Sequence, residues 1–352
     1  MKKIAFLSLS ALLMLAASCS DDNNEPTRPA VPTDPVTYVP SVDDQVTFNA
    51  PEHNIDFEFD GNYYTFEYSN GQKITYTLAN NSTLGYYAVV KKMQGENVIV
   101  PAEVKAIRAS DGEELTYKTV AFNLNQEGSE TVKTLTVSKD ITGGYANNAL
   151  GDLTATWVRA QLEMMPNLEK VELEKGFVNF TTIDGAIYTN DLKTLVAVPR
   201  GRSGIFTIAE DTKTVDDRAF YYCNRLTAIT FPAGIESIGD EAVTFNEMLV
   251  LLNMEPSVAP ATSEYSFGKM AQTSLLRIPA GSKDSYFPAK PEIERPVAPS
   301  EPSLDASDEE YMEYLDALAE YNKALDAYNE EMSVYERPVG FRNFTNVEEV
   351  NF

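Results

Sequence analysis

Residues 215–231, VDDRAFYYCNRLTAITF, and residues 238–254, IGDEAVTFNEMLVLLNM, align without a gap at a step of 23 residues. Turn and polar positions align as well as apolar ones, so chance matching of apolar residues is a poor explanation. A step of this length is typical of a solenoid with one short strand in each coil. The apolar positions that keep the step are Phe206/Ile229/Leu252, Ile208/Phe231/Met254, Val215/Ile238, Ala219/Ala242, Phe220/Val243 and Leu226/Leu249.

The segment 219–232, AFYYCNRLTAITFP, followed by Ile235 and Ile238-Gly239, resembles the BspA-like leucine-rich-repeat family. Residues 183–200 are similar to the hairpin insertion of that family, and residues 275–286 to its closing segment. The resemblance is specific from 184 to 286 and extends in weaker form back to about 85. It implies a mainly β protein built as a short, irregular solenoid, with a stretched repeat at 120–137, a further strand at 168–173 and a possible helix at 157–165.

The chain before the repeats alternates apolar and polar residues with period two. Asp60-Gly61 and Asn70-Gly71 separate three such runs, and these dipeptides are strong signals for hairpin turns. The alternation predicts a β-meander over residues 45–105, with Pro101 at an edge or a turn.

The N-terminus indicates export. Lys2 and Lys3 precede an apolar run, and Leu15-Ala16-Ala17-Ser18-Cys19 resembles the lipobox of bacterial lipoproteins. This resemblance implies cleavage before Cys19 and acylation of that residue, which would become the lipid anchor in the membrane. An ordinary secretory signal is the alternative. The acidic run at 20–25 resembles an export signal to the outer-membrane surface, and the proline-rich residues up to 44 predict an extended tether.

The C-terminal region departs from the repeat pattern. Several prolines precede Ser307 and Glu310, which have the spacing of a capping box, and an amphipathic helix of about 29 residues follows. Its tyrosine seam, Tyr314, Tyr321, Tyr328 and Tyr335, repeats every seven residues. The seam either packs on the proline-rich arm or the body, or binds a partner or a second copy.

The predicted order along the chain has six segments. They are a signal peptide at 1–18, a lipid anchor and tether at 19–44, a β-meander at 45–105, a leucine-rich-repeat domain at 106–287 with a hairpin insertion at 183–200, a proline-rich arm with an amphipathic helix at 288–338, and a C-terminal strand at 339–352.

Composition and the rare reactive residues argue against catalysis. The formal charge of -25 disfavours nucleic acid as a partner. His53 is the single histidine and Cys223 the only cysteine besides Cys19, so no zinc motif or catalytic triad is apparent. The sequence therefore predicts no catalytic residue, no metal site and no cofactor.

Two functions remain open. BspA-like proteins are known as adhesins, so the resemblance implies a non-enzymatic surface lipoprotein that binds a host or neighbouring-cell protein. The alternative is a glycan-binding accessory lipoprotein of a nutrient-uptake system. Exposed aromatic residues grouped on one concave face would favour a glycan, whereas scattered ones would favour a protein.

Overall fold

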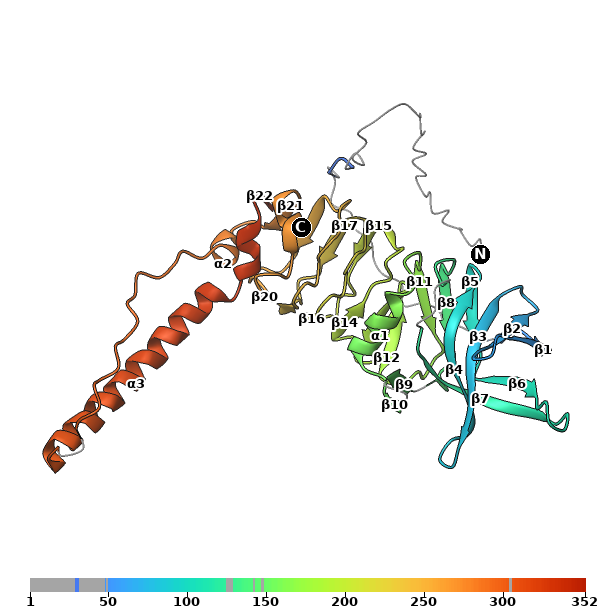
Figure 1. The fold of residues 1–352 in the computed structure, drawn as a ribbon. Coiled ribbons are helices and arrows are strands. Elements are labelled where there is room, and N and C mark those ends of the chain that lie inside the picture. The colour runs from blue at the N-terminus through green and yellow to red at the C-terminus, as the bar shows by residue number, and fades with distance from the viewer. Residues whose placement is uncertain are drawn as a thin grey trace, which may run out of the picture.

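The structure is a computed structural model, and it describes residues 29–31, 48, 50–124, 129–141, 143–146, 149–303 and 306–352. Figure 1 shows three parts in a row: an antiparallel sheet, a stack of coils, and a helical arm that leaves the far end of the stack. The predicted signal peptide and Cys19 lie outside the described residues, as does nearly all of the tether.

The antiparallel sheet is formed by the predicted meander. Strands β1 to β4 pair in sequence order, and Gly61 and Gly71 turn the chain with φ values of 99° and 81°. A positive φ is easily reached by glycine, so both hairpins predicted from Asp60-Gly61 and Asn70-Gly71 are confirmed. The strands are β1 (His53–Phe59), β2 (Tyr64–Tyr68), β3 (Lys73–Asn81) and β4 (Gly85–Gln94).

One strand from the predicted meander belongs to the first coils of the solenoid. Val98, Leu135 and Val171 occupy equivalent positions on three parallel strands, β5, β8 and β11, with steps of 37 and 36 residues. Strand β5 therefore joins the first coils, although the sequence placed it in the meander. The elements here are β5 (Asn97–Val100), β6 (Glu103–Ile107), β7 (Glu114–Phe122), β8 (Thr134–Val137), β9 (Gly143–Ala146), β10 (Ala149–Asp152), α1 (Ala155–Leu162) and β11 (Lys170–Leu173).

The regular coils form two facing sheets. The first has the order β12-β13-β14-β16-β18-β20 and opens with the predicted hairpin insertion, and the second has the order β15-β17-β19-β21-β22. The elements are β12 (Phe180–Ile183), β13 (Ala186–Thr189), β14 (Thr194–Ala197), β15 (Ser203–Thr207), β16 (Thr214–Val215), β17 (Arg225–Phe231), β18 (Ser237–Ile238), β19 (Leu251–Met254), β20 (Ala261–Thr262), η1 (Gly268–Gln272), β21 (Leu275–Pro279) and α2 (Lys283–Tyr286).

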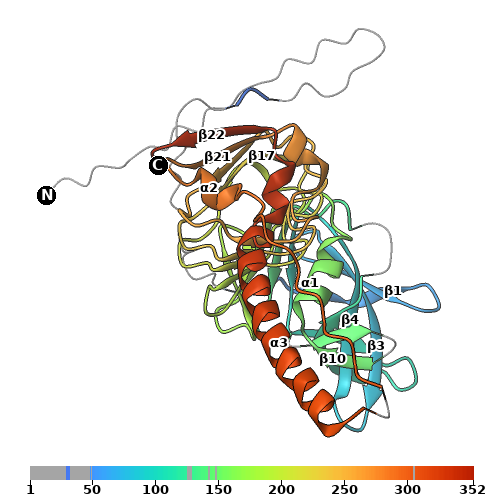
Figure 2. The ribbon, with the colours of Figure 1, turned by 90° about the vertical axis from the view of Figure 1, so that its left-hand side faces the viewer.

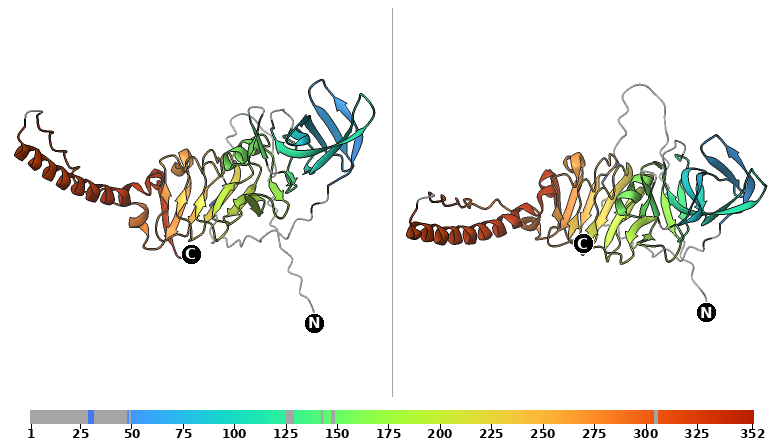
Figure 3. Two further views of the ribbon diagram at one scale, coloured as in Figure 1. Left: turned by 90° about the horizontal axis from the view of Figure 1, so that it is seen from below. Right: turned by 60° about the horizontal axis from the view of Figure 1, so that its bottom comes forward.

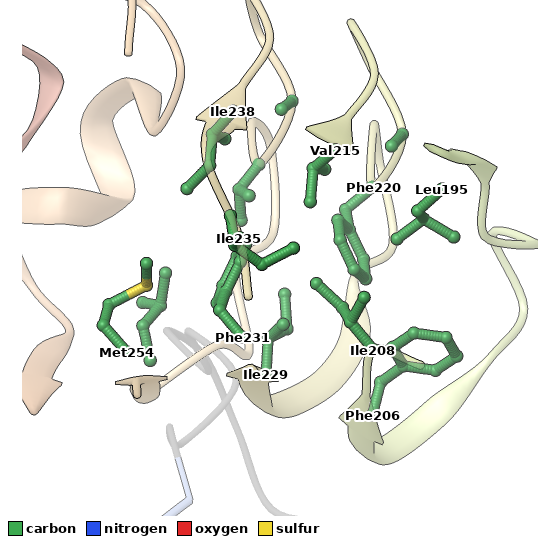
Figure 4. Close-up of a cluster of buried hydrophobic side chains, with 14 of the residues drawn as sticks. Leu195, Phe206, Ile208, Val215, Phe220, Ile229, Phe231, Ile235, Ile238 and Met254 are labelled. Carbon is green, nitrogen blue, oxygen red and sulfur yellow. The ribbon is translucent and has the colours of Figure 1, made fainter. Parts of the chain in front are cut away.

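The strand register confirms the step of 23 residues. Ile229 pairs with Leu252 and Phe231 with Met254 in one sheet, and Val215 pairs with Ile238 in the other. The side chains at these positions point into the space between the two sheets, where Figure 4 shows them interlocked. Full burial of one such side chain contributes about 2 to 3 kcal/mol, so the repeat core is the main source of stability in this region.

The end of the stack is closed by residues that follow the arm. Helix α3 (Asp308–Glu336) leads to η2 (Val339–Asn343) and β22 (Asn346–Val350), which pairs in parallel with β21. Phe341 has no exposed surface and contacts Phe267 and Tyr286. The expectation that the stack closes by Tyr286 is therefore wrong, because the core continues through Phe341 and the predicted C-terminal strand.

Candidate interaction surfaces

The arm is an isolated α-helix accompanied by an extended proline-rich segment. Helix α3 has 29 residues, none of them buried, and begins with the predicted capping box. The backbone N–H of Glu310 donates to Ser307 Oγ at 3.3 Å, and the N–H of Ser307 donates to Glu310 Oε2 at 2.7 Å. The bond from the Ser307 N–H is the main cause that lowers the pKa of Glu310, and the cap fixes the helix start at the tip of the arm.

The tyrosine seam lies on the partly covered face of α3. Figures 2 and 3 show residues 288–303 running beside α3. The seam residues are half-buried, whereas most residues on the other faces of α3 are exposed. The prolines of the segment are half-buried too, at Pro288, Pro291, Pro296, Pro299 and Pro302. Three of the four steps between these prolines are of three residues, as suits a polyproline II helix that keeps one face towards its neighbour. Packing of the seam on the arm stays a prediction.

The base of the arm is fixed to the last coil. Thr262 donates its N–H to the carbonyl of Arg337 at 2.9 Å, and its Oγ1 accepts from the N–H of Gly340 at 2.8 Å. The guanidinium of Arg342 lies 3.6 Å from the ring centroid of Tyr335 and donates to the carbonyl of that residue. Contact with the body therefore begins at about Arg337, and the free part of the arm ends just before it.

The solvent-facing side of the arm is strongly acidic. Helix α3 holds ten Asp and Glu residues and one lysine, Lys323. Two such rods repel each other at ordinary ionic strength, so the charge disfavours self-association through this helix and favours a basic partner.

A second surface lies on the coil turns and was not foreseen from the sequence. Tyr222 and Phe245, one repeat step apart, are 39% and 48% exposed. Their rings stack with centroids 4.6 Å apart and an interplanar angle of 12°, and Tyr221 stands perpendicular to both. We call Tyr221, Tyr222 and Phe245 the aromatic ladder.

Two arginines cover the ladder, and each also meets a carboxylate. The guanidinium of Arg200 lies 5.1 Å from the Tyr222 centroid and 3.5 Å from a Glu163 oxygen. The guanidinium of Arg218 lies 5.2 Å from the Tyr221 centroid and 2.6 Å from Glu241. Such contacts contribute about 0.5 to 1 kcal/mol at an exposed site, and they hold the rings in place.

The backbone of the ladder is strained. Tyr222 and Phe245 have φ values of 60° and 59°, a left-handed conformation that costs a bulky residue about 1 kcal/mol or more. Gly268 occupies the next equivalent position with φ 53°, and a Cβ there would lie 2.9 Å from Thr244 Cγ2. The glycine is the one sequence signal for this conformation. The exposed aromatics at the other two positions gain little by burial, so packing does not explain them.

The residues considered for chemistry have structural roles. His53 Nε2 accepts a hydrogen bond from the Lys105 N–H at 3.0 Å, and its ring contacts Phe66 and Tyr68. Cys223 is fully buried in the repeat core, and burial raises the pKa of its thiol to about 12. Cys223 therefore acts as a small core residue. Within the described ranges, no three His, Cys, Asp or Glu side chains are placed to share a metal ion.

A family model describing the BspA type leucine rich repeat region matches six copies within residues 204–286. Residues 204–286 are a BspA-type leucine-rich repeat region. Such repeats are found mainly in cell-surface proteins and serve as protein-interaction modules. The match coincides with the coils whose strands keep the 23-residue register, so the family resemblance noted in the sequence is confirmed for this region.

Solved structures with similarity to the chain include other leucine-rich repeat proteins. One from Eubacterium ventriosum is 18% identical with a TM-score of 0.28, covering 47% of each chain. One from Bacteroides ovatus is 16% identical with a TM-score of 0.26, covering 58% of this chain and 48% of that one. A leucine-rich cell surface protein from Faecalibacterium prausnitzii is 13% identical with a TM-score of 0.24, covering 66% and 50%.

The chain spans about half the length of these three structures. No curated protein matches the chain significantly. Among the helices of the described residues, none combines the length and the apolar character needed to cross a bilayer.

Proposed function

We propose that this protein is a non-enzymatic, lipid-anchored protein of the outer-membrane surface that binds a protein of a host or neighbouring cell, with the arm as its reaching element. The observation that carries the proposal is the projection of α3 from the end of a closed solenoid with none of its residues buried. A helix of this length spans about 43 Å. An element that adds so little burial to the fold is better explained by contact with a partner.

The distribution of exposed aromatic residues favours a protein partner over a glycan. In the described residues they lie on separate elements: Phe59 on the meander, Tyr222 and Phe245 on the coils, Tyr265 before η1, Tyr311 on the arm, and Phe352 after β22. Tyr222 stacks on Phe245 and Phe59 stacks on Tyr64, and these two pairs lie on different parts of the chain. The described residues therefore show no broad aromatic platform suited to a sugar chain. Tyrosine and arginine are enriched among the anchor residues of protein interfaces.

Binding by the arm is tested with the soluble protein comprising residues 20–352 and a variant in which a Gly/Ser bridge replaces residues 289–335. We expect the full protein to bind the surface of host or neighbouring bacterial cells in flow cytometry, and the variant to lose that binding while keeping its far-ultraviolet β signal. Equal binding by both proteins would exclude the arm as the reaching element.

Charged substitutions give a finer test of the same element. Tyr321→Glu and Tyr328→Glu detach the proline-rich segment without shortening the helix, because carboxylates do not pack on proline rings. Tyr311→Glu, at the exposed tip, is the matched control for added charge. Loss of cell binding in the two seam variants alone would mean that the partner recognises the helix together with its proline-rich neighbour.

The lipid anchor is part of the proposal and rests on the lipobox resemblance around Cys19. Cys19→Ala is expected to abolish metabolic labelling with a fatty acid and to leave an uncleaved precursor. Several acyl chains anchor a protein firmly, since each buried methylene adds roughly 0.8 kcal/mol. Labelling that persists in Cys19→Ala would exclude the anchor but would leave the protein-binding proposal standing.

A further inference from the structure

The outer face of the second sheet, which points away from the repeat core, is apolar and buried. Each strand of this sheet sends alternate side chains to its two faces. The outward side chains form a hydrophobic cluster separate from the repeat core, and its members Ala228 and Leu251 have no exposed surface. The strand register places four outward residues side by side, and we call them the outer apolar row: Ile205, Ala228, Leu251 and Leu275.

The outer face of the first sheet is different. Its outward row consists of small or polar residues that are all half-buried: Thr194, Thr214, Ser237 and Ala261. The second sheet instead contains continuous apolar runs such as residues 249–252, LVLL. Runs of this kind are typical of strands that are covered on both faces. The second sheet therefore has the sequence of a sheet with a further layer packed on its outside.

No described element supplies this layer. Among the described helices and strands, the main contacts of β17, β19 and β21 are with neighbouring strands of the same sheet. Helix α1 contacts β14 of the first sheet, and the arm leaves the far end of the stack. The cover of the outer apolar row is therefore a part of this chain beyond these elements, a second copy of the chain, or a partner.

The chain before β1 passes this face. Residues 29–31 are described, and Figures 1 and 2 both show this short blue piece on the outer side of the second sheet, above β17. Pro29 is half-buried. Further along, the carbonyl of Glu52 accepts a hydrogen bond from the N–H of Ser69 in the meander at 2.7 Å. Residues 32–47, which lie outside the described residues, must therefore connect the outer side of the second sheet with the meander.

The composition of residues 32–47 suits an apolar face. The segment has four valines, one tyrosine and three prolines, and it contains no lysine or arginine. Because proline has no backbone N–H, a proline-rich segment can cover an apolar face and leave few buried donors unpaired. At about 3.1 Å per residue the segment spans roughly 50 Å. Five strands extend over only about 20 Å, so its length is sufficient to cross the whole sheet.

We propose that the outer apolar row is the docking site of the chain's own N-terminal segment, residues 29–47. A second copy is the weaker candidate because chains with a charge of -25 repel each other. A segment of the same chain has no such encounter to make, and its effective concentration is on the order of millimolar. The predicted tether then lies across the coils, and only residues 20–28 remain as a free spacer.

This inference goes beyond the proposed function and does not depend on it. The docked segment withdraws the apolar face of the coils from any partner and leaves the arm as the reaching element. It also gives the prolines and valines of the predicted tether a role in packing, where the sequence indicated only extension.

Photo-crosslinking of the soluble protein comprising residues 20–352 tests the docking. The photoreactive residue p-benzoylphenylalanine replaces Leu275, a half-buried member of the row, and mass spectrometry identifies the residues to which it attaches. The matched control carries the same photoreactive residue in place of Thr214, on the outer face of the first sheet. We expect attachment to residues 29–47 of the same chain to be several-fold more frequent from position 275 than from position 214.

Changes within the segment test whether its apolar side chains make the contact. One triple variant alters three valines that recur at steps of three, on one side of a polyproline II helix: Val36→Asp, Val39→Asp and Val42→Asp. Its control adds the same charge at polar positions of the segment: Thr37→Asp, Ser41→Asp and Thr47→Asp. The valine variant should lose most of the crosslinks, because carboxylates do not pack on an apolar face, whereas the control should keep them. Neither variant alters a residue of the solenoid, so a damaged core is not the cause of the loss.

Three results would overturn the proposal. The first is the absence of attachment to residues 29–47 from position 275, or equal attachment from position 214. The second is an equal loss of crosslinks in the two triple variants. The third is attachment between two chains, detected by mixing unlabelled and nitrogen-15-labelled protein, which would assign the face to a second copy. The measurement uses purified protein without a partner, so its result is independent of the proposed function.

Discussion

The coils and the arm place apolar residues in opposite situations. In the coils, residues such as Phe220 and Phe231 have no exposed surface. In the arm, the four seam tyrosines of α3 are only half-buried, although they repeat as regularly as the coil residues do. Periodicity therefore reports which face of an element is apolar, but the depth of burial depends on what covers that face.

The two regions meet at residues 337–344, where the chain returns from the arm into the core. The arm interrupts the stack and does not terminate it, because β22 adds a fifth strand to the sheet that contains β21. The boundary between them therefore lies at about Arg337, where the chain first bonds to the last coil, and full burial resumes at Phe341, well after the last recognisable repeat.

The largest effect is expected from removing the side chain that closes the core. Phe341→Ala should lower the free energy of unfolding by about 3 to 5 kcal/mol, because Phe341 is fully buried against Phe267, Tyr286 and Phe344. Thermal unfolding measures the change, and Phe352→Ala, at the exposed end of the chain, is the control. A loss below about 1 kcal/mol would show that the C-terminal cap is not part of the cooperative core.

The repeat core should also show a specific weakness at alkaline pH. Burial raises the pKa of Cys223 from its ordinary value of 9.0 to about 12. The thiol of the unfolded chain loses its proton at a lower pH than the buried thiol of the folded chain. The contribution of the buried thiol to the free energy of unfolding is therefore fully present below pH 9. It is lost as the pH rises to 12, at about 1.4 kcal/mol per pH unit.

Denaturant unfolding from pH 8 to pH 11 checks this expectation. Buried tyrosines such as Tyr188 also have a raised pKa, so the comparison with Cys223→Ala isolates the thiol. The variant should lose stability less steeply with pH. If the free energy of unfolding fell equally steeply with pH in both proteins, the thiol would be accessible in the folded protein or still buried in the unfolded chain.

Much of the fold could be predicted because local signals agree with it. The hairpins at Gly61 and Gly71, the 23-residue register and the capping box at Ser307 depend on neighbours close in sequence or on one constant step. Strand β5 was assigned to the meander because its coils have steps of 37 and 36 residues, and a search for one period does not detect them. Phe341 was missed because the arm separates it from the core that it joins.

The candidate sites were less predictable for different physical reasons. The tyrosine seam is visible in the sequence as a stripe, but the proline spacing of its neighbour, residues 288–303, does not specify what that segment packs against. The aromatic ladder was hidden because Tyr222 and Phe245 are unusual in a left-handed conformation, and their sequence alone suggests core residues. Only the alignment of both with Gly268 indicates a turn that exposes them.

A smaller effect is expected when the arm is removed from the body. Replacing residues 289–335 with a Gly/Ser bridge should shift the melting temperature by only a few degrees, since 1 kcal/mol corresponds to about 2–4 °C in a body of this size. The bonds of Thr262 to Arg337 and Gly340 remain in this variant. Extending the deletion to residue 344 removes Phe341 and Phe344 and should destabilise the protein as strongly as Phe341→Ala. Similar melting temperatures for the two deletions would contradict the boundary at Arg337.

The smallest effect should be confined to the tip of the arm. Ser307→Ala removes the side-chain acceptor for the Glu310 N–H, and loss of such a cap costs a helix about 1 kcal/mol. Because the first turn of α3 has no contact with the core, the cost appears as local fraying. Hydrogen exchange of the amides at 308–312 should accelerate about fivefold, while the melting temperature of the body stays constant. Ser333→Ala is the matched control: it removes a bond from Ser333 Oγ to the Glu330 carbonyl inside the helix, where alanine is the better helix former, and exchange at the tip should not change. A lower melting temperature of the coils in Ser307→Ala would mean that the arm and the coils unfold together, and the contrast between the two regions would then hold for burial but not for stability.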